Sequence, residues 1–233
     1  MISLLNLSFN IQHGKPQIRT TNNFPMPEFW ESIYSNNNKM WGEDPTDNAR
    51  YVLELFRKNN VRSVLIPGFG YGRNARVFHD AGMVVSGIEI SATAIERARK
   101  YFSEEVIIHH GSVSKMPFDN ERFDAVYCWS LIHLLNKADR LKLIENCHAQ
   151  LEPDGLMVFT ALSIYDKRFG EGQEIDKNTF QSPNGLTLYF YDEASIREEF
   201  GKYDILELSE IDEPEVNPNE RQWMIICKKN SSA

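Results

Sequence analysis

Three glycines and one acidic residue have the types and spacing of a nucleotide-binding site. Gly68, Gly70 and Gly72 fall within VLIPGFGYGRNA, between an expected strand and an expected helix. Glycine lets the backbone turn sharply and approach a ligand, and the free N–H groups at the start of the next helix attract negative charge. Glu89 follows Gly68 by 21 positions, at the end of the next expected strand. A carboxylate at that position can accept hydrogen bonds from a ribose diol.

The glycine spacing argues against a dinucleotide. A dinucleotide-binding fingerprint has the form G-x-G-x-x-G, and here Arg73 occupies its third position. A pyrophosphate needs the close approach that this third glycine allows, whereas a smaller group bearing a carboxylate does not. Arg73 also opens a helix, where its charge opposes the helix dipole, so we expect it to bind an anionic group. A surface ion pair is the alternative interpretation.

Alternating strand and helix patterns surround this loop. Strands are expected at 62–66, 83–89, 106–110, 123–129 and 155–162, followed by late strands near 203–210 and 221–228. Helices are expected at 27–34, at 47–58 behind the capping residue Thr46, from the glycine loop to about 81, at 92–102 behind Ser91, at 137–151 and behind Asp192. Such alternation predicts a mostly parallel sheet with helices on both faces and with its ligands at the carboxyl ends of the strands. Residues 1–26 read as a flexible arm and 27–233 as a single domain.

The run from Trp41 to Leu162 resembles the class I methyltransferases that depend on S-adenosylmethionine. In that family GIEIS would end the second strand, GSVSKMPF would supply the adenine site, FDAVYCWSLIHLL would line the floor beneath the sulfonium, and LEPDGLMVF would lead into the fifth strand. The resemblance implies a Rossmann-like, doubly wound, seven-stranded sheet whose last strand is antiparallel. It departs from the family at Ile66, where an acid is usual, and at Ser112, where an aspartate is common.

Two subgroups of the family share further motifs with this chain. WGEDP and GRNA are similar to the tellurite-resistance type, and LIPGFG is similar to the thiol, halide and thiopurine methyltransferases. Both subgroups methylate small and often soft nucleophiles, so the resemblance implies a small-molecule acceptor such as a thiol or a chalcogen oxyanion. It implies S-adenosylmethionine as cofactor and S-adenosylhomocysteine as product. The residues expected at the cofactor are Tyr34, Trp41, Pro67, Gly68, Phe69, Gly70, Arg73, Asn74, Glu89, Ile90, Ser112, Val113, Cys128 and Ser130.

Methyl transfer needs alignment of the reactants more than it needs a catalytic side chain. If the acceptor must lose a proton, His133 is the expected base, because it follows the fourth strand at the carboxyl edge of the sheet. A hydrogen-bonded structural histidine is the alternative in the apolar run SLIHLL. Aromatic faces suit a sulfonium cation, and Tyr34, Trp41, Tyr71 and Trp129 could supply them, with core packing as the alternative for each.

A long polar insertion, 164–190, follows the fifth strand. A segment of that length at this position is usually a lid or a binding loop. We expect it to select the substrate, with Tyr165, Arg168, Phe169, Tyr189 and Tyr191 as candidate contacts; a structural hairpin over the sheet is the alternative.

Composition limits the partners. The formal net charge is −8, from 33 acidic and 25 basic residues, which gives no overall attraction to a phosphate backbone. Three widely spaced cysteines have no metal-binding or disulfide spacing, so we expect them to be reduced and predict no metal. The sequence shows no charged leader and no long apolar stretch. It therefore predicts a cytoplasmic protein, a monomer or homodimer, that acts on a small molecule and not on nucleic acid or membrane.

Two other functions remain open at this stage. A binding or regulatory protein could keep the fold and the ligand without catalysis. A nicotinamide-dependent oxidoreductase could use the same strand, loop and helix arrangement, although the glycine spacing disfavours it.

Overall fold

The computed structural model describes residues 26–36, 42–117, 120–182, 185–212 and 220–231. The expected arm at 1–26 therefore lies outside the described residues except for Met26, and so does Trp41. Residues 213–219 of the acidic loop between the two late strands also lie outside them.

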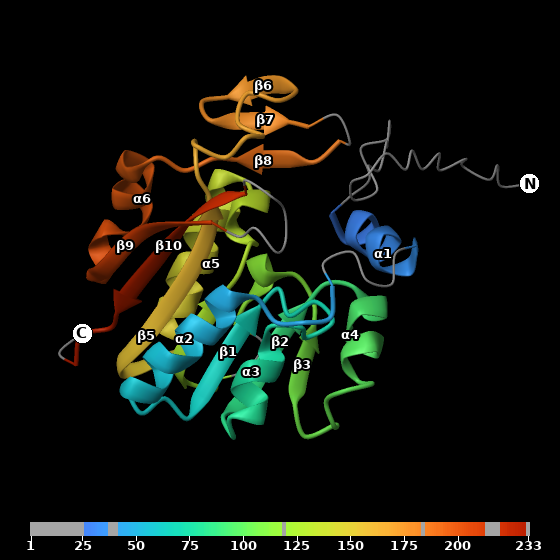
Figure 1. The fold of residues 1–233 in the computed structure, drawn as a ribbon, viewed down its shortest axis with the longest axis vertical. Helices are drawn as coiled ribbons and strands as arrows, with labels where there is room; N and C mark the ends of the chain where they lie inside the picture. The colour runs from blue at the N-terminus through green and yellow to red at the C-terminus, as the bar shows by residue number, and fades with distance from the viewer. Residues whose placement is uncertain (1–25, 37–41, 118–119, 183–184, 213–219, 232–233) are drawn as a thin grey trace, which may run out of the picture.

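Seven strands form one sheet in the order β3-β2-β1-β4-β5-β10-β9 (Figure 1). Their bounds are β1 Ser63–Pro67, β2 Val84–Glu89, β3 Ile107–His110, β4 Phe123–Cys128, β5 Leu151–Leu162, β9 Ile205–Asp212 and β10 Arg221–Lys228. β1 pairs in parallel with β2 and β4, β2 with β3, and β4 with β5. β10 runs antiparallel to both β5 and β9, so the last strand in sequence alone reverses direction. The expected fold class is confirmed.

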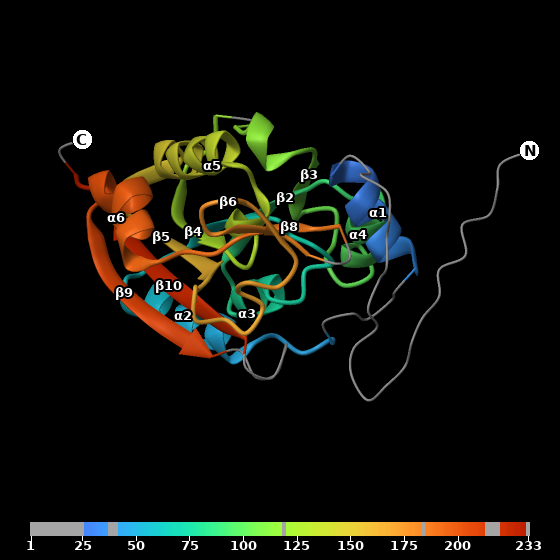
Figure 2. The same cartoon turned by 90° about the horizontal axis from the view of Figure 1, so that it is seen from above.

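Helices cover both faces of this sheet (Figure 2). They are α1 Met26–Asn36, α2 Asp47–Lys58, α3 Ala75–Asp80, α4 Ala92–Ala98, α5 Lys137–Ala149 and α6 Glu193–Phe200, with the short 3-10 helices η1 Val113–Lys115, η2 Ile132–Leu134 and η3 Gly201–Tyr203. Successive strand residues point to opposite faces, so Val64 packs in the core that α2 and α3 cover, and Leu65 packs in the core that α5 and α6 cover. Both faces of the sheet are therefore buried, as parallel sheets require.

Local signals set several element boundaries. The Thr46 hydroxyl accepts the Ala49 N–H at 3.2 Å, and α2 has the bounds that the capping residue and the periodicity predict. β9 begins two residues later than expected, because η3 continues past α6 and Asp204 then takes a left-handed conformation with φ of 51°. β5 begins at Leu151, four residues earlier than expected.

The segment after β5 builds a small sheet of its own. β6 Gln173–Asp176, β7 Thr179–Gln181 and β8 Thr187–Tyr189 pair antiparallel. Leu162, Phe180, Leu188 and Phe190 form a hydrophobic cluster separate from the two cores of the main sheet. Figure 1 shows this small sheet beyond the carboxyl ends of the parallel strands, with α1 beyond the same edge on the β3 side. These two elements therefore flank the edge at which open α/β sheets bind ligands.

Candidate functional site

The glycine loop joins β1 to α3 in a conformation that depends on its glycines. Gly68, Gly70 and Gly72 have φ of 72°, 57° and 79°, in the left-handed region. A Cβ on Gly72 would lie 2.2 Å from Cε2 of Phe102, so this glycine is also required by the packing beneath the loop. A Cβ on Gly70 would lie 3.0 Å from Oη of Tyr34, above the loop. The spacing G-x-G-x-G thus serves turn geometry at all three positions, and a side chain lies close to each of the three glycines.

Glu89 ties the end of β2 to this loop. Its Oε2 accepts the Gly70 N–H at 2.7 Å, and its Oε1 accepts the N–H groups of Ile90 and Ser91, both at 2.8 Å. The side chain is 5% exposed, and burial raises the pKa of its carboxyl although these three bonds oppose the rise. A carboxylate offers about four lone-pair positions, so one remains for a ribose hydroxyl while the Gly70 bond is kept.

Helix α1 covers the loop and is anchored to α4. The Glu31 carboxylate accepts the Ser91 hydroxyl at 2.6 Å, the Thr93 N–H at 3.3 Å and the Thr93 hydroxyl. These bonds lower the pKa of Glu31 and place a negative charge at the start of α4, where the helix dipole favours it. One turn further along α1, Tyr34 is 8% exposed and lies against Gly70. Glu31 was not among the predicted residues, because its partners lie about 60 positions away.

The predicted adenine side lies where β2 and β3 end together. Glu89 pairs with His110 in the last register of the two strands, and Gly111 donates its N–H to the Glu89 carbonyl at 2.8 Å. Ser112 then caps η1, with its hydroxyl 2.9 Å from that of Ser114. Val113 is buried beside it. The Ser112 hydroxyl therefore has a local partner, and its contact with an adenine remains a prediction.

The end of β4 is where the floor of the cofactor site is predicted. Cys128 is fully buried, and burial raises its pKa well above the usual range, which makes it a packing residue. Ser130 follows with φ of 49°, and its N–H donates to the Thr160 hydroxyl at 2.9 Å. Leu131 then reaches Gly68, on which a Cβ would lie 3.1 Å from Leu131 Cδ2. Ser130 therefore lies on a short segment between the glycine loop and β5.

Arg73 and Asn74, which end the glycine loop, have different environments. Arg73 is 7% exposed, and its guanidinium carbon lies 5.0 Å from the centroid of the Trp129 ring. Arg73 is therefore buried against an aromatic ring and does not lie on the open surface. Asn74 Oδ1 accepts the Thr46 N–H at 3.1 Å, so it joins the start of α2 to the loop. The Asn74 side-chain oxygen therefore has a partner within the protein, and the contact of Asn74 with the cofactor remains a prediction.

Pro67 and Phe69 support the loop from below. Pro67 is the last residue of β1 and pairs with Ile88 of β2. The Phe69 ring is buried, and a Cβ on Gly87 would lie 2.1 Å from its Cδ2. The Phe69 ring therefore packs beneath the loop, and a contact of Phe69 with the cofactor remains a prediction.

His133 has the environment of a structural residue. It lies in η2, is 5% exposed, and its Nδ1 accepts the Leu162 N–H at 3.3 Å. Burial, with a contribution from the charge of Arg168, lowers its pKa to about 3. Because the Nδ1 lone pair is used and the ring resists protonation, the structure does not support the predicted role as a base. The hydrogen-bonded alternative is the one that fits.

Arg168 is held by two carboxylates. Its Nε and Nη2 donate to Asp166 at 2.7 and 3.0 Å, and Nη2 lies 3.4 Å from Glu220 Oε1. Asp166 and Glu220 are 3% and 6% exposed. The ion pair fixes the start of the 164–190 segment against the entry to β10, where the Arg221 N–H donates to Asp166 at 2.9 Å. Arg168 is thus a brace in this structure and not an open anion-binding side chain.

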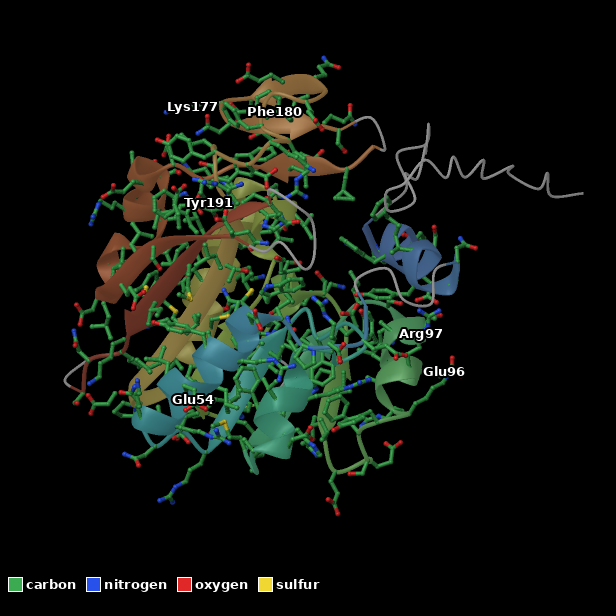
Figure 3. All side chains as sticks on the ribbon, viewed as in Figure 1. Glu54, Glu96, Arg97, Lys177, Phe180 and Tyr191 are labelled. Carbon is green, nitrogen blue, oxygen red and sulfur yellow. The ribbon has the colours of Figure 1, made fainter. Side chains whose placement is uncertain are left out.

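The predicted aromatic contacts of the insertion separate into two groups. Tyr165 is 63% exposed, and Phe169 is 39% exposed and packs edge-on against Phe180 and Phe190 of the small sheet. Tyr191 is fully buried in the core beneath α6, as Figure 3 shows below Phe180, and it donates to Glu199 at 2.7 Å. Tyr191 was therefore wrongly predicted as a substrate contact. Tyr189 stacks on Arg140, which pairs with the same Glu199.

No group of three or more potential metal ligands occurs among the described residues. Within the same ranges, no helix has the length and apolar character of a membrane span.

Comparison with known proteins agrees with this geometry. Residues 64–155, from β1 to the early part of β5, match the family model described as "Methyltransferase domain". The tRNA N(3)-methylcytidine methyltransferase Mettl2 of Drosophila melanogaster is 25% identical over 191 residues, covering 73% of this chain and 59% of that protein. The dTDP-3-amino-3,6-dideoxy-alpha-D-glucopyranose N,N-dimethyltransferase of Streptomyces fradiae is 30% identical over 121 residues, covering 50% of this chain and 47% of that protein. The chain thus spans about half the length of these relatives.

Solved structures extend the likeness to nearly the whole chain. The 1,6-didemethyltoxoflavin-N1-methyltransferase of Burkholderia thailandensis, bound to 1,6-didemethyltoxoflavin and S-adenosylhomocysteine, matches with a TM-score of 0.68 and 16% identity over 95% of this chain and 98% of that one. The glycopeptide N-methyltransferase MtfA, bound to S-adenosylmethionine, matches with a TM-score of 0.59 and 20% identity over 79% and 94%. Residues 64–155 therefore match a methyltransferase domain, and the chain shares the Rossmann-like fold of solved methyltransferases that bind S-adenosylmethionine or S-adenosylhomocysteine.

Proposed function

We propose that this protein binds S-adenosylmethionine at the glycine loop and transfers its methyl group to a small-molecule acceptor. The observation that carries the proposal is the joint arrangement of the loop and Glu89. The Gly70 N–H donates to the buried Glu89 carboxylate at the end of β2. The glycine turn, which would hold the methionine part, and the carboxylate, which would hold the ribose, are therefore joined by a hydrogen bond. The match of residues 64–155 to a methyltransferase domain supports the same cofactor.

The residues of the loop fit the cofactor in size and charge. Gly68 and Gly70 carry no side chains of their own, and Arg73 supplies a positive charge beside the loop for the carboxylate of the methionine part. Tyr34 and Trp129 supply aromatic surface near a sulfonium, by cation–π attraction. Ser112 and Val113 lie where β3 ends, as an adenine site requires.

The cofactor supplies a methyl group on a positively charged sulfur, which a nucleophile displaces in line. This chain's residues then have three tasks: they align the acceptor, exclude water and stabilise the positive charge before transfer. His133 is not assigned to deprotonation, since its pKa is lowered to about 3. An acceptor that reaches the site already deprotonated, such as a thiolate or an oxyanion, suits a site organised in this way.

A small molecule is proposed in preference to RNA, although a relative is a tRNA methyltransferase by name. The reason is the net charge of −8, which opposes binding to a phosphate backbone. The acceptor would bind on the side of the small sheet, where Tyr165 and Phe169 of the 164–190 segment expose aromatic surface.

Two measurements test the proposal. In calorimetry, S-adenosylmethionine and S-adenosylhomocysteine should bind and NAD should not; binding of NAD alone would overturn the assignment. Release of S-adenosylhomocysteine is then measured with a panel of thiols, phenols, amines, chalcogen oxyanions and a tRNA pool. Turnover with tRNA alone would replace the small-molecule acceptor, and tight cofactor binding without turnover on any acceptor would favour a binding protein.

A further inference from the structure

A buried chain of polar groups leads from the 164–190 segment to the end of β4. Arg168 lies 3.4 Å from Glu220 Oε1, Gln222 Nε2 lies 2.7 Å from the same oxygen, and Gln222 Nε2 also lies 2.7 Å from Ser130 Oγ. Gln222 is fully buried, whereas Ser130 is half-buried. We call Ser130, Gln222, Glu220, Arg168 and Asp166 the β10 relay.

Charge fixes the direction of the hydrogen bonds in this relay. A carboxylate only accepts, so the atom of Gln222 that faces Glu220 must be the amide nitrogen. Arg168 Nη2 faces the same carboxylate at 3.4 Å, as a second donor beside Gln222. Because the nitrogen also faces Ser130, its second N–H donates to the Ser130 oxygen. The Gln222 side chain therefore cannot reverse without placing its own oxygen against Glu220.

With these bond directions fixed, the hydroxyl hydrogen of Ser130 is the part of the relay that can change its partner. In the structure it points to Gln222 Oε1 at 3.0 Å, the longer of the two contacts between these side chains. A hydroxyl hydrogen rotates freely about the C–O bond, so it can turn to another acceptor while the bond from Gln222 is kept. The backbone of Ser130 does not follow, because its left-handed conformation is held by the N–H bond to Thr160.

Ser130 lies between the two halves of the candidate site. Leu131 beside it reaches Gly68 in the cofactor loop, and η2 after it packs against β8 of the small sheet. Ser130 therefore lies close to both the glycine loop and the small sheet, and its side chain is half-buried.

We propose that Ser130 is a specificity-determining hydrogen-bond donor to the methyl acceptor, and that Gln222 and Glu220 are positioning residues that orient it. The acceptor class is a molecule with an oxygen or nitrogen lone pair near the atom that is methylated, such as a carbonyl, a ring nitrogen or an oxyanion. The role of Ser130 toward the acceptor rests on the proposed function, whereas the orientation of Gln222 does not.

A chemical probe tests the orientation without any substrate. In Ser130→Cys the introduced thiol replaces the hydroxyl, and the three native cysteines are buried. If Gln222 donates to this position, it stabilises the thiolate, so alkylation by iodoacetamide at pH 7 should be about tenfold slower in Ser130→Cys/Gln222→Met. The matched control, Ser130→Cys/Gln173→Met, changes an exposed glutamine of β6 and should react like Ser130→Cys. Equal rates in all three proteins would overturn the orientation.

A double-mutant cycle tests the functional part with the acceptors that turn over. Ser130→Ala and Gln222→Met should each lower kcat about tenfold with unchanged binding of S-adenosylhomocysteine, and Gln222→Met should cost nothing further in the Ser130→Ala background. Additive losses would mean that Gln222 does not act through Ser130. This cycle also decides the matter if Ser130→Cys does not fold. Failure of wild-type protein to bind S-adenosylmethionine would refute the proposed function instead, and the alkylation rates would still report on the relay.

Discussion

Glu89→Gln is the sharpest perturbation of the candidate cofactor site, because it replaces one oxygen and keeps the volume. Three backbone N–H groups face this carboxylate, one at Oε2 and two at Oε1. The amide keeps more bonds if its oxygen faces Ile90 and Ser91, which turns its NH₂ group toward the N–H of Gly70. Two donors then face each other at the centre of the glycine loop.

The cost follows from burial. A buried hydrogen-bonding group left without a partner costs about 1 to 3 kcal/mol, so the free energy of unfolding should fall by that amount. Binding should weaken as well, because the remaining oxygen no longer carries the charge that strengthens a bond from a ribose hydroxyl. We expect S-adenosylhomocysteine to bind about ten- to hundredfold more weakly.

Urea unfolding and isothermal titration calorimetry with S-adenosylhomocysteine measure the two effects. Glu96→Gln is the matched control, since Glu96 is exposed on α4 and extends outward in Figure 3. Burial raises the pKa of Glu89 above its ordinary value, so wild-type affinity should fall as the pH is lowered through that raised pKa and the carboxylate gains a proton. The affinity of Glu89→Gln should lack this step.

The reasoning fails in two recognisable ways. Lower stability with wild-type affinity would mean that Glu89 braces the loop but does not bind the ribose. Wild-type stability with wild-type affinity would mean that the three backbone bonds are not present in solution.

Three further predictions concern α1, η2 and α6. Glu31→Ala should release α1 from α4 and weaken S-adenosylhomocysteine binding severalfold in calorimetry, whereas Glu28→Ala, on an exposed position of the same helix, should not. His133 stays neutral in the folded protein, with a pKa of about 3, and takes up a proton near its ordinary pKa when the chain unfolds. Relative to His133→Gln, the wild type should therefore lose about 1.4 kcal/mol of stability per pH unit below 6.5. Equal pH dependence of the two proteins would refute the burial of His133. Tyr191→Phe should cost about 2 kcal/mol in urea unfolding through its lost bond to Glu199 and leave the KM for an acceptor unchanged; a raised KM at full stability would restore the original prediction.

The features that the sequence predicted well are those encoded by neighbours in the chain. Thr46 caps the helix that starts beside it, and the glycine loop lies between a strand and a helix with its own apolar patterns. The parallel order of the strands follows from the alternation of strands and helices. This order alone predicts that Glu89, at the end of β2, lies beside the loop that follows β1.

The features that it missed depend on contacts far apart in the chain. In the run TLYFYD, alternation places Phe190 and Tyr191 on opposite sides, but the pattern does not say which core each one meets. The structure gives Phe190 to the small sheet and Tyr191 to the core under α6. Arg168 has one partner two residues away and another at Glu220, and Ser130 meets Gln222 across 92 positions. These residues come together only when the whole sheet has folded.

The separate hydrophobic cluster of the small sheet has a consequence for how such a chain can diverge. Phe180, Leu188 and Phe190 pack with one another and with Leu162 at the end of β5, while the glycine loop and Glu89 draw on the core beneath α2 and α3 and on backbone N–H groups. Residues of the small sheet can therefore be replaced, lengthened or grafted from a relative, provided that the contacts with Leu162, the pairing of Asp166 and Arg168 at β10, and the buried Tyr191 are preserved. Evolution and protein engineering can thus alter the small sheet while the glycine loop and Glu89 stay intact.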